Sequence, residues 1–380
     1  MKIKVLHVIG SLRIGGAENV AMNIYRYIDR DKYEFHYLVY GESIGDYEEE
    51  VMELGGKVIH MEYSPQITIG KYMRAFSNIV GENGPYEIVH AHMMLHNGLV
   101  LKVAKILKIP VRISHAHSTD DGKVRKGLWD CGIRQVYNLI SRKRIKWYAT
   151  HFLSCGDKAG NFLYGYKLYK KRGVLIKNGI DIEKFCFNEK IRYEMRKKYG
   201  FEDKIILGCV GHFEPVKNHN YLISLFEKIY KCNSNTLLLL LGDGKLKDDI
   251  YQKVQELHLE KNVLFTGNVA NVSDWMQAMD CLLMPSLYEG VPVTLIEAQA
   301  SGLKCFVSDT VSTEVNVTGD VTFFPLKDSY AGWRNIANLN IKYERRQSGE
   351  IVKQKGYDVK SNIKKIEEIY NQSRVEIECG

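Results

Sequence analysis

The segment from Pro285 to Ala298 has the composition of a loop that leads into a helix. Proline is tolerated best in the first turn of a helix, so Pro292 predicts a helix start directly after a loop that carries Gly290. The first amides of such a helix, those of Val293 and Thr294, have no partner within the helix and favour an anion. The spacing therefore predicts a phosphate-binding helix terminus.

Two carboxylates flank this anion site. Glu289 precedes the predicted helix, and Glu297 follows one turn further along the face of Val293. Carboxylates accept hydrogen bonds, so the pair is suited to hold hydroxyl groups on either side of a phosphate. Taken singly, each has a simpler interpretation: an exposed loop residue for Glu289, and for Glu297 an acid that the helix dipole favours.

A glycine pair, Gly15 and Gly16, follows the first predicted strand and opens the first predicted helix. Open α/β sheets bind ligands at such a point. The position after Gly15 holds glycine, not the lysine of a nucleotide triphosphatase loop, and the GxGxxG dinucleotide pattern is absent. The amides can approach an anionic or sugar ligand, or else the turn simply requires glycine.

Two histidine pairs stand at predicted strand ends, which are ligand-facing positions in such sheets. His90 and His92 end one strand and are suited to line a ligand site, and His115 and His117 end the next. A metal site built from these four lacks carboxylates at supporting spacing. The string Asp29-Arg30-Asp31 lies between a helix and a strand and is interpreted as a solvated helix exit. No catalytic metal is predicted.

Short β-branched runs alternate with longer amphipathic segments through both halves, which is typical of βα units around a parallel sheet. The turn-forming Asn178-Gly179 separates the halves. The sequence predicts an α/β protein of two doubly wound domains, residues 1–178 and 179–355. Residues 356–380 are expected to form a closing helix that packs back toward the first domain.

Composition predicts a globular protein, and neither a leader nor a membrane span is expected. Of its 380 residues, 45% are hydrophobic and 26% charged. No apolar run reaches the roughly 20 residues of a spanning helix, and no leader-like stretch opens the chain. Eight cysteines occur singly, which fits reduced thiols in a cytosol.

The positive charge lies in the first half. Residues 1–180 hold 27 Lys and Arg against 17 Asp and Glu, whereas the remainder holds 26 against 28. Within 102–177 the basic residues are interleaved with aromatics, and Leu128 to Ile145 has apolar positions at helical spacing before a basic run. This pattern favours a peripheral helix on an anionic membrane. The alternatives are nucleic-acid binding, for which no module is present, and a solvated basic face.

Several segments, in this order, together resemble the retaining glycosyltransferases of the GT4 family. They are Gly15-Gly16-Ala17-Glu18, Asn178 to Asp181 with Phe185, Val210 to Phe213 with Lys217-Asn218, Leu241 to Gly244, Phe265 to Gly267, and the Glu289 and Glu297 pair in Pro285 to Ala298. The resemblance implies the GT-B fold, in which two Rossmann-like domains face a cleft. It is strongest to bacterial enzymes of capsular and exopolysaccharide biosynthesis.

The family's roles transfer to matching positions in the second half. The resemblance implies that Glu297 holds the ribose of a nucleotide sugar, that Glu289 contacts the transferred sugar, and that the amides after Gly290 meet the diphosphate. Lys217 matches the diphosphate-binding lysine, whose cation stabilises the leaving group. The family's usual arginine after Gly211 is His212 here, which offers fewer donors than a guanidinium.

In the first half, the family's donor-facing histidine corresponds to His117, with His115 as the alternative. Gly15 and Gly16 are counted with the donor-binding residues. The expected activity is transfer of a hexosyl group from a nucleoside diphosphate sugar, with a UDP sugar expected, to a hydroxyl of a lipid-linked saccharide. No separate cofactor and no nucleic-acid partner are expected.

Two alternatives share this fold: a nucleotide-sugar 2-epimerase, and a non-catalytic partner subunit, which His212 favours. The expected location is the cytoplasm, peripheral on the inner face of the plasma membrane. The donor sugar, linkage, acceptor and oligomeric state are not set by these motifs, because several loops together select one hydroxyl orientation.

Overall fold

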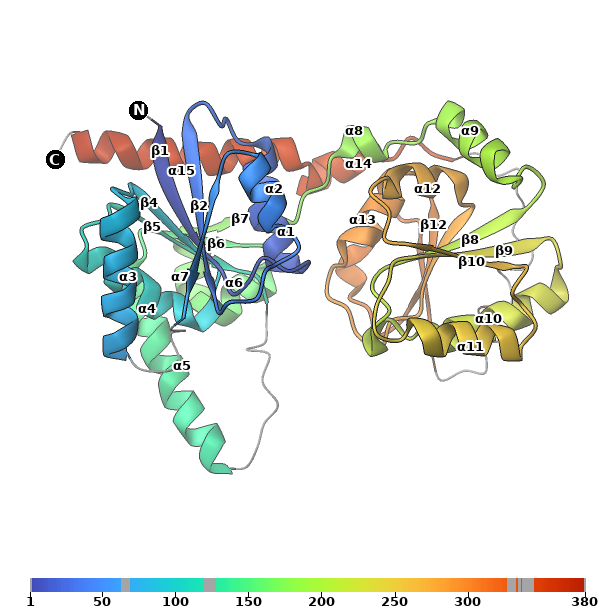
Figure 1. Cartoon of the computed structure of the whole chain (residues 1–380), viewed down its shortest axis with the longest axis horizontal. Coiled ribbons are helices and arrows are strands. Elements are labelled where there is room, and N and C mark those ends of the chain that lie inside the picture. Colours follow the sequence, from blue (N-terminus) through green and yellow to red (C-terminus); the bar gives the residue numbers. More distant parts are fainter. Residues whose placement is uncertain are drawn as a thin grey trace. The chain divides into compact units, whose positions relative to one another are not determined.

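The computed structural model describes residues 2–62, 69–118, 128–326, 333, 336 and 345–378. The chain forms two compact units (Figure 1). The first combines Met1–Gly179 with Val359–Gly380, and the second is Ile180–Asp358. These divisions fall within three residues of the sequence-based boundaries.

The first unit is built on a seven-stranded parallel sheet with the order β3-β2-β1-β4-β5-β6-β7. The strands are β1 (Ile3–Val8), β2 (Tyr33–Tyr40), β3 (Lys57–Met61), β4 (Ile88–Ala91), β5 (Val111–Ala116), β6 (His151–Ser154) and β7 (Gly173–Leu175). The strand order reverses between β1 and β4. Open α/β sheets bind ligands at this switch point, beyond the carboxyl ends of the strands.

Helices cover both faces of this sheet. They are α1 (Gly16–Tyr27), α2 (Glu48–Glu53), α3 (Ile69–Asn83), α4 (Asn97–Ile106), α5 (Leu128–Tyr148), α6 (Asp157–Tyr164), α7 (Tyr166–Arg172) and α15 (Val359–Glu378), with the 3₁₀ turn η1 (Met94–His96). Val5 belongs to the core under α1 and α15, whereas Leu6 belongs to the core under α3 and α4. Successive side chains of a strand point to opposite faces, so one strand supplies both cores.

The second unit repeats the design with six parallel strands in the order β10-β9-β8-β11-β12-β13. The strands are β8 (Ile205–Val210), β9 (Thr236–Leu241), β10 (Val263–Gly267), β11 (Cys281–Met284), β12 (Lys304–Ser308) and β13 (Val321–Phe324). Here the order reverses between β8 and β11. The predicted doubly wound fold is therefore confirmed in both halves.

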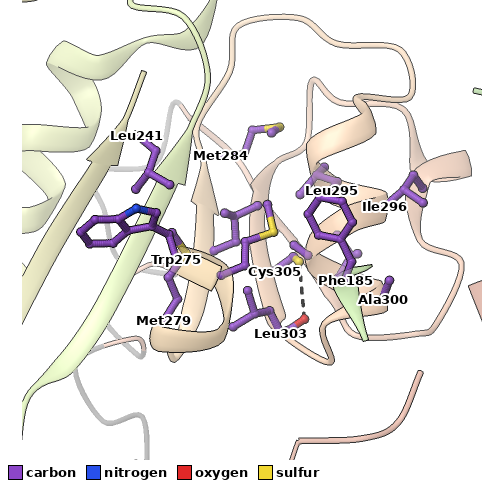
Figure 2. Packing of buried hydrophobic residues seen from close by; sticks show 14 of the residues in the cluster. Phe185, Leu241, Trp275, Met279, Met284, Leu295, Ile296, Ala300, Leu303 and Cys305 are labelled. Atoms are coloured by element: carbon purple, nitrogen blue, oxygen red, sulfur yellow. Dashed lines mark hydrogen bonds between the residues drawn. The ribbon is translucent and has the colours of Figure 1, made fainter. Parts of the chain in front are cut away.

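The helices of the second unit are short, and each packs its apolar face against the core of this unit. They are α8 (Ile182–Phe185), α9 (Glu189–Tyr199), α10 (His219–Cys232), α11 (Lys247–Glu256), α12 (Val272–Ala278), α13 (Val293–Ala300) and α14 (Gly349–Val352), with the 3₁₀ turns η2 (Pro215–Lys217) and η3 (Thr313–Val315) and the π-helical segment η5 (Lys353–Tyr357). Figure 2 shows Leu295, Ile296 and Ala300 of α13 in one apolar cluster with Phe185 and Cys305. This cluster fixes α13 against the sheet.

Candidate functional site

Two loops of the second unit meet beyond the carboxyl ends of β8 and β11. Asn218 donates a side-chain hydrogen bond to the carbonyl oxygen of Pro285 at 3.1 Å, and the amide of Leu287 donates to the carbonyl oxygen of Val216 at 2.7 Å. Because β8 and β11 are neighbours at the switch point, loops about 70 residues apart in sequence become adjacent.

Lys217 and Glu289 form an ion pair across these two loops. Lys217 Nζ lies 2.6 Å from Glu289 Oε1, and each side chain is only 19% exposed. An unpaired buried charge is costly, and the ion pair offsets part of the cost of removing the two charges from water. The sequence assigned these residues to different parts of a donor substrate, and the structure places them in direct contact.

Glycines allow the lysine to occupy this position. A Cβ at Gly211 would lie 3.2 Å from Cε of Lys217, and a Cβ at Gly242 would lie 2.1 Å from the carbonyl oxygen of Gly211. Gly242 also has φ +138°, a conformation that other residues rarely adopt. His212 follows in the same loop, where it is exposed and its carbonyl oxygen accepts from the amide of Glu214 at 2.8 Å.

The predicted helix start after Gly290 is present as α13, with Pro292 at its N-cap. The amides of Val293 and Thr294 are its first two donors, which no residue of the helix can satisfy. Both residues and Glu297 are partly exposed, whereas the opposite side of the helix packs into the core. The helix therefore presents its N-terminal donors and one carboxylate on its open side.

Burial alters the acidity of Glu297. Loss of solvent raises the pKa of this carboxyl from 4.5 to about 7, and the charge of Lys184 on α8 opposes the rise. The roles of Glu297 and Glu289 toward different parts of the donor stay predictions from the family resemblance. Glu289 belongs to the loop held by the backbone of Ser312, whose amide donates to its carbonyl oxygen at 3.1 Å.

In the first unit, Gly15 is the N-cap of α1, and the Glu18 carboxylate occupies the space where a side chain at position 15 would lie. A Cβ at Gly15 would lie 2.5 Å from Oε2 of Glu18, and burial raises the pKa of Glu18. Gly16 has no atom within 4 Å of its Cβ position. In the sequence, Glu18 stands out only as part of the motif Gly15-Gly16-Ala17-Glu18. Its carboxylate favours a hydroxyl-bearing ligand over an anion at the Gly15 end of this loop.

The predicted histidine pairs meet in one cluster, and a fifth histidine joins them. His117 Nε2 lies 2.8 Å from His92 Nδ1, and His90 Nε2 lies 3.1 Å from His115 Nδ1. His7 Nδ1 on β1 lies 3.0 Å from His92 Nε2. The sequence pattern does not single out His7, because one histidine inside an apolar strand gives no functional signal.

Burial shifts these imidazoles toward the neutral form. It lowers the pKa of His7 and of His117 to about 3, and it lowers the pKa values of His90, His92 and His115 well below 6.5. Repulsion among the neighbouring imidazoles adds to the effect of burial for the last three. A neutral imidazole keeps one ring nitrogen as an acceptor or ligand.

The Asp29-Arg30-Asp31 string forms a turn between α1 and β2. The amide of Asp31 donates to Asp29 Oδ1 at 3.0 Å, and Arg30 donates to the carbonyl oxygen of Arg26 at 2.8 Å. These local contacts agree with the predicted helix exit.

The described part of α5 exposes apolar side chains. Val136, Leu139 and Trp147 are 57%, 58% and 77% exposed, and Lys143 is exposed on the same helical face. The predicted apolar positions at Trp129 and Ile133 lie outside the described side chains. None of the described helices is both long and apolar enough to cross a membrane.

Comparison with known proteins identifies related sequences for both halves. The profile described as "Glycosyltransferase Family 4" matches residues 14–184, and that described as "Glycosyl transferases group 1" matches residues 191–322. The chain is 34% identical over 379 residues to the protein named glycosyltransferase EpsF in Bacillus subtilis (strain 168), with 97% of each chain covered.

A second relative and a solved structure extend the comparison. The Escherichia coli UDP-Gal:alpha-D-GlcNAc-diphosphoundecaprenol alpha-1,3-galactosyltransferase is 25% identical over 325 residues, which cover 81% of this chain and 80% of that protein. The structure of Anabaena Alr3699/HepE in complex with UDP superimposes with a TM-score of 0.74 at 18% identity, over 98% of this chain and 100% of the other. The similarity in structure establishes the GT-B fold.

Proposed function

Because the chain belongs to the group 1 glycosyltransferases of the GT4 family, we propose that it is a retaining hexosyltransferase that uses a UDP sugar. The acceptor is a hydroxyl of a lipid-linked saccharide in cell-surface polysaccharide biosynthesis. The Lys217 and Glu289 ion pair at the switch point of the second sheet is the observation that supports this proposal most directly. The named specificity of the Escherichia coli relative, with UDP-Gal as donor and a diphosphoundecaprenol-linked acceptor, supports this choice of substrates.

The second unit binds the nucleotide in this proposal. Lys217 and the first amides of α13 hold the diphosphate, which gains negative charge as the glycosyl bond breaks. Glu297 accepts hydrogen bonds from the ribose hydroxyls. An ammonium group has three N–H donors, so Lys217 can keep its contact with Glu289 while it donates to the diphosphate.

Glu289 orients the transferred sugar in this proposal. The ion pair fixes one carboxylate oxygen against Lys217, which leaves the other free to accept from a sugar hydroxyl. The pair thereby couples the leaving group to the transferred group. A fixed geometry of this kind accelerates transfer by positioning rather than by covalent chemistry.

The first unit supplies the acceptor site in this proposal. In the same unit, Gly15 and Gly16, which open α1 beyond the carboxyl end of β1, and His117, which follows β5, are the residues that we assign to the donor. The carboxylate of Glu18 suits a hydroxyl-rich ligand beside Gly15. The contact of His117 with the donor sugar remains a prediction from the family resemblance.

The exposed face of α5 is proposed to hold the enzyme on the inner face of the plasma membrane. Its apolar residues Val136, Leu139 and Trp147 are suited to the interfacial region, and Lys143 and Lys146 are suited to anionic headgroups. Such peripheral binding brings the enzyme to a lipid-linked acceptor.

A transfer assay tests the proposed reaction. Purified protein is incubated with individual UDP sugars and a bacterial lipid extract, and labelled lipid is extracted. Lys217→Ala is expected to lower kcat/KM by about 100-fold or more, because one preorganised charge contact with the leaving group is lost. Lys231→Ala, which removes an exposed lysine of α10, is the matched control.

The alternatives give different products. Sugar interconversion without an acceptor identifies an epimerase, and nucleotide binding with neither product identifies a partner subunit. Either result contradicts the proposed transferase activity.

A further inference from the structure

Five histidines lie on one face of the first sheet. His7 is in β1, His90 in β4 and His115 in β5. His92 lies two residues after His90, and His117 lies two residues after His115. Residues two apart in a strand point to the same face, so the strand pairing gathers all five. Their rings pack with centroids 4.3–5.5 Å apart.

The ring nitrogens form two connected rows. One runs from His7 through His92 to His117, with nitrogen separations of 3.0 and 2.8 Å. The other runs from Tyr370 on α15 through His90 to His115, with separations of 2.8 and 3.1 Å. At each close nitrogen pair only one atom can carry the shared proton, so the other must present a lone pair.

The cluster also contains buried nitrogens that lack a partner. In the part of the chain that the structure describes, His7 Nε2, His115 Nε2 and His117 Nδ1 have no hydrogen-bond partner. A buried polar atom that is left unsatisfied destabilises the folded state, so a ligand for such an atom is favoured. One ring nitrogen from each of His92, His115 and His117 lies within 4.8 Å of those from the other two.

We propose that His92, His115 and His117 form a binding site for a divalent transition metal of the zinc class. Imidazole nitrogen is a preferred ligand of Zn²⁺, Co²⁺ and Ni²⁺, whereas Mg²⁺ and Ca²⁺ require oxygen ligands that this trio lacks. Three imidazoles leave the fourth tetrahedral position for water or another oxygen.

The surrounding histidines act as supports for the three ligands. His92 contacts the metal through Nδ1 while its Nε2 is held by His7, and His115 contacts the metal through Nε2 while its Nδ1 is held by His90. Metal-bound histidines usually donate their second ring N–H to such a partner, which orients the ring. Here imidazoles take the place that carboxylates often occupy.

Geometry and access favour this trio over the other close group, which consists of His7, His90 and His92. Two nitrogens each about 2.05 Å from a tetrahedral zinc lie roughly 3.3 Å apart, so the 2.8 Å between His92 and His117 needs only a small opening. His117 is partly exposed, which gives the ion a route from solvent, whereas all three members of the other group are buried.

Metal titration of the untagged, full-length protein tests the site. After removal of metal with a chelator, Zn²⁺ binding is measured by equilibrium dialysis, and Co²⁺ binding by visible absorption. The expected result is about one ion per chain with the intense spectrum of a tetrahedral cobalt site. His117→Gln should weaken binding by more than about tenfold, and His7→Phe, which removes a supporting imidazole, by about tenfold.

His60→Gln is the matched control, because His60 is a partly exposed histidine of the same unit outside the cluster. Circular dichroism confirms that each variant is folded. The proposal is overturned by binding of fewer than one ion per chain, by an octahedral cobalt spectrum, or by equal affinities of His117→Gln and the control. Any of these three outcomes would show that the cluster is a hydrogen-bonded stack of imidazoles that binds no metal. None of these measurements depends on glycosyl transfer.

Discussion

Glu297 illustrates how a binding residue can oppose stability. Its carboxyl group lies on the open side of α13 but is buried enough to raise its pKa to about 7. In the unfolded chain the same group loses its proton near pH 4.5. The folded state therefore holds a proton that the unfolded state has lost over this interval, and stability falls as pH rises through it.

Glu297→Gln is expected to stabilise the second unit at pH 8 by about 2 kcal/mol, since glutamine has no charge to desolvate. The difference from wild type should nearly vanish at pH 4.5. Hydrogen exchange in β11 and β12, followed at both pH values, measures the effect. A variant whose stability changes with pH as much as that of wild type would contradict the assigned pKa.

The same substitution is expected to weaken UDP binding by about tenfold at pH 8, because hydrogen bonds to a charged acceptor contribute about 1.5–3 kcal/mol. Calorimetric titration with UDP measures this. An unchanged affinity would remove Glu297 from the proposed nucleotide site.

At the scale of elements, the position of Lys217 depends on the close approach of two loops. The loop after β9 reaches the loop after β8 because Gly242 has no side chain. A Cβ there would overlap the carbonyl oxygen of Gly211, in backbone that only glycine adopts readily. The glycine-rich turns are thus as necessary to the site as the charged residues.

Gly242→Ala is expected to destabilise the second unit by about 1–3 kcal/mol and to abolish most transfer, because the loop that carries Lys217 must shift. Gly81→Ala is a useful comparison: it lies in α3 with no atom within 4 Å of the Cβ position, and should stabilise the first unit by up to about 1 kcal/mol. Urea unfolding together with the transfer assay distinguishes them. Wild-type activity in Gly242→Ala would show that the loop tolerates displacement.

The last helix, α15, completes the core of the first unit although it follows the second unit in sequence. Ile363, Ile366 and Tyr370 are buried against residues of β1, β2 and α1. Tyr370 also contacts His90 at 2.8 Å. The residues that precede the second unit in sequence and those that follow it therefore pack into one apolar core.

Ile366→Ala is expected to destabilise the first unit by about 2–5 kcal/mol, the usual cost of a cavity at a fully buried position. Ile351→Ala, at a position 40% exposed on α14, should change stability by less than about 0.5 kcal/mol. Thermal unfolding compares the two. Similar midpoints would show that α15 contributes little to the fold.

The alternation of strands and helices was sufficient to predict two doubly wound domains, since each strand is a distinct apolar run. The contact between Lys217 and Glu289 could not be derived from spacing, because it depends on which strands are neighbours. The histidine cluster was out of reach for the same reason: His7 lies 83 residues before His90 and becomes its neighbour only when β1 pairs with β4. Sequence patterns identify elements, whereas strand order determines which residues meet.

At the scale of the whole molecule, the uneven charge gives the proposed membrane contact a location. The first 180 residues carry the net positive charge, and Lys143 and Lys146 place part of it beside the exposed apolar face of α5. Attraction to anionic lipid is screened by salt, whereas burial of Val136 and Leu139 in the interface is not. The two contributions can therefore be measured separately.

Flotation with lipid vesicles is expected to recover the protein with anionic vesicles at low salt and much less with neutral ones. Each exposed lysine near the surface contributes about 1 kcal/mol, so Lys143→Glu with Lys146→Glu should lower binding by more than about 20-fold. The matched control, Lys190→Glu with Lys231→Glu, makes the same change in net charge on exposed helices of the second unit. Leu139→Ser should instead weaken the binding that persists at high salt. If the control pair lost as much binding as the α5 pair, net charge alone would explain the attraction and α5 would have no specific role.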